Sequence, residues 1–196
     1  VATGDAGFFD DDGHLKIIDR AKDVGRMKDG TMFAPKYIEN KLKFFPYIKE
    51  VVAFGNEKIF ASALICIDIE AVGNWAEKRN LAYSGYTDLS ARKEVYDLVQ
   101  DCVESVNTDL ARDEKLRGSQ IKRYLLLHKE LDADDGEITR TRKVRRSTIS
   151  DKYSELIDAL DDLQQTHREI ESEMTFEDGR VGNVKADLQI RELNLV

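Results

Sequence analysis

Two apolar runs separated by a short polar turn constrain the fold of this chain more than any other feature. Residues 51–54 and 59–69 are mostly hydrophobic, and residues 55–58 (Gly-Asn-Glu-Lys) lie between them with the composition of a turn. Strands that are apolar on both faces belong in a sheet that helices cover. The two runs therefore predict a strand pair at the centre of a layered fold.

Helical patterns on either side of this pair would supply the covering layers. Pro35 stands at a first helical position, and apolar residues then recur at helical spacing until Pro46 ends the element. A second helix is expected over 70–80, and an apolar stripe over 95–110 predicts a third. A strand at 124–127 follows. Interleaved strands and helices predict an α+β fold, with a small sheet flanked by helices.

The two ends of the chain carry further elements. A β-hairpin opens the chain, with strands at 7–9 and 14–18 joined by an Asp-Asp-Asp-Gly turn. Apolar residues spaced from Ile149 to Ile170 predict one long amphipathic helix that ends near Met174. A pair of short strands is expected over 178–193.

Composition excludes several classes of protein. The 196-residue chain is 41% hydrophobic and 35% charged, and its formal net charge is -8. No apolar run approaches the roughly 20 residues that cross a bilayer, and an acidic balance argues against a general nucleic-acid binder. The start, Val1-Ala2-Thr3-Gly4-Asp5, has no initiator Met and no signal-peptide pattern, so we expect a fragment of a longer chain.

Cysteine and histidine give little support for a disulfide framework or a metal centre. Cys66 and Cys102 lie inside apolar runs, which favours buried, reduced thiols in a cytosolic protein. His14, His128 and His167 are isolated, without a second ligand at metal spacing. We therefore predict no metal site in this chain.

Four short motifs stand in a fixed order along the chain. They are Thr3-Gly4-Asp5, Asp19-Arg20-x-Lys22-Asp23, Ala34-Pro35-x-x-Ile38-Glu39 and Glu137-Ile138-Thr139-x-Thr141-x-Lys143-Val144-x-Arg146. Each motif alone is weak. Together they resemble the carboxy-terminal part of the adenylate-forming (AMP-binding) enzymes, and most closely the long-chain fatty acyl-CoA synthetases. The resemblance covers residues 1 to about 160.

The resemblance implies an acid-thiol ligase with two half-reactions. A fatty-acid carboxylate attacks the α-phosphate of Mg²⁺-bound ATP to give an acyl adenylate, and the thiol of CoA then displaces AMP. Lys143 matches the family's catalytic lysine, and Asp5 and Arg20 match residues that bind the ATP ribose. The Mg²⁺ ligands and the fatty-acid pocket would lie upstream, so the isolated fragment is expected to be inactive.

The resemblance also divides the chain into parts. Residues 1–21 would end the amino-terminal core domain, Lys22 would be the hinge, residues 23–150 would form the mobile lid domain, and residues 151–196 a helical extension with short strands. The segment over 19–31 is charged and lacks periodicity, which predicts a loop or a loosely paired ribbon and makes it a candidate moving loop.

Within this loop, Gly25, Lys28 and Gly30 would lie on the CoA side of the active site. Many short-chain relatives have a basic residue in this loop near Thr31; this chain has none there, although Lys28 is close.

From the residues alone, Lys143 is one member of a basic run over 140–146, and such runs are commonly solvated surface. The alternatives are a module that binds nucleic acid, an anionic membrane surface or a partner, and an enzyme that loads a carrier protein. The resemblance favours the CoA ligase, with fatty acid, ATP, CoA and the amino-terminal domain of the same chain as partners and no nucleic acid. A cytoplasmic location is expected, with peripheral membrane association left open.

Overall fold

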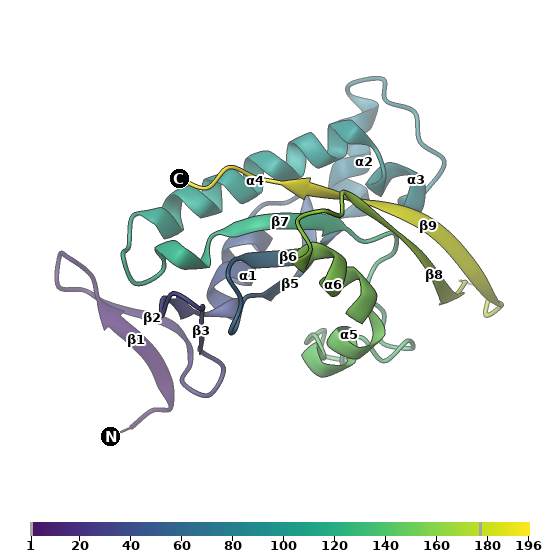
Figure 1. Cartoon of the computed structure of the whole chain (residues 1–196). Helices are drawn as coiled ribbons and strands as arrows, with labels where there is room; N and C mark the ends of the chain where they lie inside the picture. Colours follow the sequence, from purple (N-terminus) through teal and green to yellow (C-terminus); the bar gives the residue numbers. More distant parts are fainter. Residues whose placement is uncertain (1, 177) are drawn as a thin grey trace.

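The predicted central sheet is present, and it contains five strands (Figure 1). The structure is a computed structural model that describes residues 2–176 and 178–196. The strand order is β5-β6-β7-β9-β8, in which only β6 and β7 are parallel neighbours. The strands are β5 (Ile48–Phe54), β6 (Ala61–Ile67), β7 (Ile121–Leu126), β8 (His167–Thr175) and β9 (Val181–Glu192).

Helices cover both faces of this sheet, which confirms the predicted α+β class. Every residue of β6 is buried, because successive side chains enter two different cores. Ile65 packs with α1 to α4, whereas Leu64 packs with α5 and α6 on the opposite face. The helices of the first face are α1 (Pro35–Lys43), α2 (Ile69–Glu77), α3 (Tyr86–Ser90) and α4 (Lys93–Ala111).

Two polar contacts fix α4 against β7. Asn107 is buried, and its side-chain amide both donates to the carbonyl of Ile121 and accepts from its N–H, each at 2.8 Å. The hydroxyl of Tyr124 donates to the carbonyl of Tyr96 at 2.7 Å. These contacts fix the position of α4, the helix predicted from the apolar stripe, relative to the sheet. A short 3₁₀ turn, η1 (Arg117–Ser119), leads into β7.

The amino-terminal hairpin lies at one end of the molecule (Figure 1). Strands β1 (Asp5–Phe9) and β2 (Leu15–Arg20) pair as the turn chemistry predicts. Phe8 and Ile18 pack against the lower part of the first core. A second ribbon, β3 (Gly25–Arg26) with β4 (Met32–Phe33), begins within the segment 19–31 and ends just after it, which confirms the alternative of a loosely paired ribbon.

The expected long helix near the carboxy terminus is wrong. Helices α5 (Arg146–Lys152) and α6 (Ser154–Asp161) replace it, and the chain then enters β8. Leu163 is exposed, and Ile170 belongs to β8 rather than to a helical stripe. Strands β8 and β9 are longer than expected and extend the central sheet through β7.

Arg123 on β7 gives a physical reason for the end of α6. Its side chain is 2% exposed, and one guanidinium nitrogen donates to the carbonyls of Ala159 and Leu160, at 3.0 and 2.8 Å, and of Asp162, at 2.6 Å. A second nitrogen donates to the carbonyl of Gln165. The carbonyls left free at a helix end thereby gain a buried cationic donor.

His128 ties the carboxy-terminal hairpin to the core. Its imidazole is fully buried, and Nε2 lies 2.7 Å from the hydroxyl oxygen of Ser172 on β8. Burial, together with the charge of Lys129, lowers the pKa of His128 to about 4. The ring is therefore neutral in the folded protein at neutral pH.

The structure places both cysteines in the interior as free thiols, as predicted. Burial raises the pKa of Cys102 to about 11 and that of Cys66 still higher. In the described residues, no helix has the length and apolar character needed to cross a membrane.

Replacing Arg123 with Met should lower the free energy of unfolding by about 3 kcal/mol, because several buried carbonyls lose their donor. Urea denaturation followed by circular dichroism measures this change. Lys122→Met, one residue away on the same strand, should change stability by less than about 0.5 kcal/mol. Equal effects of the two variants would contradict the capping role of Arg123.

Stability should also fall on mild acidification because of His128. In the unfolded chain this histidine takes up a proton near its usual pKa of about 6.5, whereas the folded protein resists protonation until about pH 4. The unfolded state therefore binds more protons in between, and the cost at pH 5 relative to pH 7 is about 2 kcal/mol. Urea titrations at both pH values should show a smaller loss for His128→Gln, and an identical loss would refute this origin.

Candidate functional site

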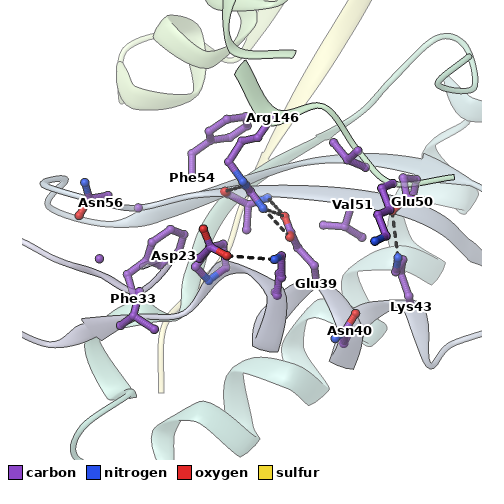
Figure 2. Close-up of a pocket in the computed structure, with 18 of the residues that line it drawn as sticks. Asp23, Phe33, Glu39, Asn40, Lys43, Glu50, Val51, Phe54, Asn56 and Arg146 are labelled. Atoms are coloured by element: carbon purple, nitrogen blue, oxygen red, sulfur yellow. Dashed lines mark hydrogen bonds and ion pairs between the residues drawn. The ribbon is translucent and has the colours of Figure 1, made fainter. Parts of the chain in front are cut away.

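A groove with a volume of about 900 Å³ lies beside α1 and β5 (Figure 2). Segments far apart in the sequence form its walls: residues 22–25, α1, β5 with the turn after it, and residues 142–146. Apolar side chains contribute part of the lining, namely Val24, Phe33, Val51, Ala53, Phe54 and Val144.

The groove concentrates positive charge on an acidic chain. Seven basic and three acidic residues line it. Four of the basic residues form ion pairs: Lys36 with Asp23 at 3.1 Å, Lys43 with Glu50 at 3.0 Å, Lys58 with Asp161 at 2.6 Å, and Arg146 with Glu39 at 2.6 Å.

Lys22, Arg142 and Lys143 form no ion pair with any residue that the structure describes. Unpaired cations above a partly apolar surface suit an anionic ligand that also carries an apolar portion.

Glu39 and Arg146 meet at the back of the groove (Figure 2). One guanidinium nitrogen lies 2.6 and 2.9 Å from the two carboxylate oxygens, and the other donates to the carbonyl of Ala53 at 2.9 Å. The N–H of Ala53 donates to Glu39 at 2.8 Å. Burial raises the pKa of Glu39, although Arg146 opposes that shift. Two of the four motifs are thus joined by one ion pair, in which only Glu39 is buried.

Lys143 lies on a short hairpin at the edge of the groove, and its side chain is exposed. Thr139 donates its N–H to the carbonyl of Lys143 at 2.8 Å, and its hydroxyl oxygen accepts the N–H of Lys143 at 3.0 Å. The hydroxyls of Thr139 and Thr141 lie 3.0 Å apart. These contacts show why threonine recurs in this motif: its hydroxyls close the turn that carries the lysine.

Asp5 and Arg20 are cross-strand partners in the amino-terminal hairpin. The guanidinium of Arg20 lies 3.0 Å from the Asp5 carboxylate, and both side chains are partly exposed. Neither residue lines the groove that contains Lys143. The predicted ribose-binding residues therefore lie on the hairpin, apart from the groove that contains Lys143.

Lys22 lies exposed between two anchored aspartates. Asp19 has a buried side chain that accepts the N–H of Lys36, at the first turn of α1, at 3.1 Å. Asp23 accepts a hydrogen bond from the ammonium of Lys36 at 3.1 Å, and this bond lowers the pKa of Asp23. The backbone on each side of Lys22 is thus held to α1.

The predicted CoA-side loop is only partly at the groove. Gly25 lines it, and a Cβ there would lie 2.2 Å from the side-chain oxygen of Asn56, so no other residue fits without movement. Gly30 occupies a turn with φ of +88°. Lys28 lines a separate, smaller cavity of about 210 Å³.

Sequence reasoning missed one cluster. Asp10, Asp12 and His14 offer ligand atoms within 4.8 Å of one another, although the histidine was expected to be isolated. One Asp10 oxygen already accepts the N–H groups of Asp12 and His14, at 3.1 and 2.8 Å. The geometry is that of the predicted hairpin turn, and it supplies no observation of a bound ion.

Sequence reasoning also assigned no role to Glu39, Glu137 or Arg146, although all three stand in the quoted motifs. Two features of the sequence could have pointed to the glutamates: Glu39 stands on the apolar side of a predicted helix, and Glu137 stands just before the lysine motif. Charge in the sequence does not show which side chains are buried.

Known proteins share this chain's fold and part of its sequence. Residues 22–165 match the family model described as "AMP-binding enzyme C-terminal domain". The long-chain-fatty-acid–CoA ligase FadD15 of Mycobacterium tuberculosis is 31% identical over 159 residues, which are 81% of this chain and 26% of that protein. The human long-chain-fatty-acid–CoA ligase 1 is 31% identical over 161 residues, covering 81% of this chain and 22% of that protein.

Solved structures agree on the fold. The adenylation domain of a carboxylate reductase from Mycobacterium chelonae has a TM-score of 0.55 at 22% identity, over 81% of this chain and 22% of that chain. The corresponding domain from Segniliparus rugosus, in complex with AMP and a carboxylic acid, has a TM-score of 0.57 at 15% identity, over the same shares.

The chain spans about a quarter of the length of the curated relatives cited. The family model covers the helix and strands that form the groove and the hairpin that carries Lys143. It confirms the resemblance that the four motifs carry. This chain belongs to the family of AMP-binding enzyme C-terminal domains.

Proposed function

We propose that this chain is the lid domain of a fatty acyl-CoA synthetase, in which it works with a larger amino-terminal domain. The full-length enzyme would join a fatty acid to CoA at the expense of ATP. The observation that supports this most is the set of three unpaired cations at the groove, because ATP, the acyl adenylate and CoA all carry phosphate. The relatives named as long-chain-fatty-acid–CoA ligases support the choice of substrates.

In the first half-reaction, a carboxylate oxygen bonds to the α-phosphorus of ATP, and the bond from that phosphorus to pyrophosphate breaks. Two anions must approach each other, and an ammonium between them lowers the barrier. The exposed side chain of Lys143 is available for this role. A unit-charge contact at about 4 Å and an effective dielectric constant near 20 is worth about 4 kcal/mol.

In the second half-reaction, the CoA sulfur bonds to the acyl carbon, and the bond from that carbon to AMP breaks. We assign the change between the two steps to rotation about Lys22, which would bring the loop with Gly25, Lys28 and Gly30 toward the acyl group. Asp5 and Arg20 would bind the ribose hydroxyls, since a carboxylate accepts and a guanidinium donates hydrogen bonds.

Mg²⁺ would arrive with ATP, and the groove itself does not fit the ion. Each of its three carboxylates, Asp23, Glu39 and Glu50, is already paired with a basic side chain. Oxygen ligands for Mg²⁺ would therefore come from the phosphates and from the rest of the full-length protein.

Three apolar side chains on the hairpin support the proposed amino-terminal partner. Phe9, Leu15 and Ile17 are 66, 59 and 54% exposed and lie on neighbouring strands. A larger domain of the same protein would cover this face.

Lys143→Ala in the full-length protein should slow adenylation by about 10²–10³ while leaving thioester formation from preformed acyl adenylate within about threefold of the unmodified rate. Pyrophosphate release and CoA thioester formation measure the two steps. The control is Arg140→Ala, an exposed arginine of the same basic run that does not line the groove. Equal losses in both half-reactions would contradict the assigned role of Lys143.

Lys22→Pro should give the opposite pattern, with thioester formation slowed more than adenylation. Proline fixes φ and restricts the residue before it, so rotation at the hinge is hindered. Lys22 donates no backbone hydrogen bond within the described chain, so the substitution removes no N–H donor that is in use. The matched control is Lys22→Ala, which removes the same charge but leaves the backbone free, so thioester formation should be slower in the proline variant than in the alanine variant. A proline variant with an unchanged thioester rate would exclude the hinge role.

A further inference from the structure

The hairpin that carries Lys143 cannot hold its own orientation. Only one isolated bridge, between Ile138 and Val144, and the contacts of Thr139 close it. Arg142 has φ of +60°, a conformation that costs a non-glycine residue about 1 kcal/mol. Two-stranded hairpins of this size are marginal in water, so the rest of the domain must supply its rigidity.

Glu137 supplies this rigidity at the start of the hairpin. Its side chain is fully buried, and its carboxylate lies 2.8 Å from the ammonium of Lys129 and 3.2 Å from that of Lys152. It also accepts the N–H of Asp132 at 3.1 Å and the hydroxyl of Tyr153. One carboxylate thus gathers donors from α5, from the residue after it, and from the loop after β7.

The protonation states of these partners favour the arrangement. Burial alone would lower the pKa of Lys129, but the hydrogen bonds that its ammonium donates to Asp135 and Glu137 raise it, so the lysine stays charged. Burial and the charge of Glu137 raise the pKa of Tyr153, so its phenol keeps the proton that it donates. Lys129 therefore meets the carboxylate of Glu137 as a cation, and Tyr153 meets it as a hydrogen-bond donor.

The same residue also holds the far strand of the hairpin. The backbone carbonyl of Glu137 accepts the N–H of Arg145 at 2.9 Å. The next residue, Arg146, is fixed by the buried carboxylate of Glu39 and by the carbonyl of Ala53. A buried carboxylate therefore stands at each end of the segment 138–145.

We propose that Glu137 and Glu39 are positioning residues, which clamp this hairpin so that Lys143 projects from a rigid base. The inference rests on the proposed function only for the chemistry of Lys143. The clamp concerns only the structure of the hairpin, so it can be tested without an activity assay. It assigns a role to two motif glutamates that basic side chains already engage.

Amide hydrogen exchange of the 196-residue chain, followed by mass spectrometry, tests the clamp directly. Glu137→Gln keeps the side-chain size but turns an amide donor toward two ammonium groups. Exchange in peptides over 138–145 should become at least about tenfold faster, while peptides over 61–67 in β6 stay unchanged. Glu39→Gln should accelerate the same hairpin peptides. The matched control is Glu171→Gln, an exposed carboxylate on β8 that lies 3.7 Å from Lys185.

Lys152→Met is a milder variant if the glutamine substitution prevents folding. It removes one of the donors to Glu137 from a half-buried position and should accelerate hairpin exchange by about threefold. Unchanged exchange over 138–145 in all three variants would overturn the proposal. Equal acceleration over 138–145 and 61–67 would also overturn it, because the glutamates would then only stabilise the whole domain.

The full-length protein provides the catalytic readout. Glu137→Gln should lower kcat for adenylation by about tenfold with little change in KM for ATP, and Glu137→Asp, which keeps the charge, should recover part of that loss. An equal loss in both half-reactions would contradict positioning of Lys143. If Lys143→Ala leaves adenylation intact while hairpin exchange still depends on Glu137, the proposed function fails and the clamp stands.

Discussion

The ion pair between the buried Glu39 and the partly exposed Arg146 is the interaction on which the groove depends. Glu39 belongs to α1, Arg146 begins α5, and both also bond to the backbone of Ala53 on β5. Helices from the two sides of the sheet are thereby joined at one point. Removing Arg146 would leave the buried carboxylate of Glu39 without its cation, which costs far more than an exposed pair contributes. The walls of the groove are therefore coupled through one contact.

This coupling also explains how an acidic chain presents a cationic surface. Each of the three carboxylates of the groove forms an ion pair with a basic side chain of the groove, and Asp161 forms one with Lys58. The remaining cations, Lys22, Arg142 and Lys143, stay unpaired within the described part of the molecule. Most of the negative charge of the chain lies elsewhere, so this face would attract phosphate-bearing molecules more than the rest of the surface.

Local periodicity predicted the layers of the fold, because β5, β6 and α4 bury whole faces. It failed after Asp161, since the helix there ends at a contact with Arg123, which lies about 40 residues earlier in the chain. Ile170, Ser172 and Met174 are two residues apart, and they alternate with more exposed residues as in a strand. Ile170 and Met174 are also four residues apart, which is a helical spacing. At the site, the motifs predicted the exposed lysine, whereas burial of Glu39 and Glu137 depends on tertiary packing that no local pattern encodes.

The turn that contains Lys22 is held by fewer contacts than the hairpin that carries Lys143. Asp19 and Asp23 are each bonded to Lys36, and one backbone hydrogen bond, from the N–H of Asp23 to the carbonyl of Arg20 at 2.9 Å, closes the turn between them. Opening such a turn forfeits about 1 kcal/mol, whereas distorting the clamped hairpin or the sheet would break buried ionic contacts. The proposed rotation is therefore confined to a few torsions, and Lys143 would move as part of a rigid body.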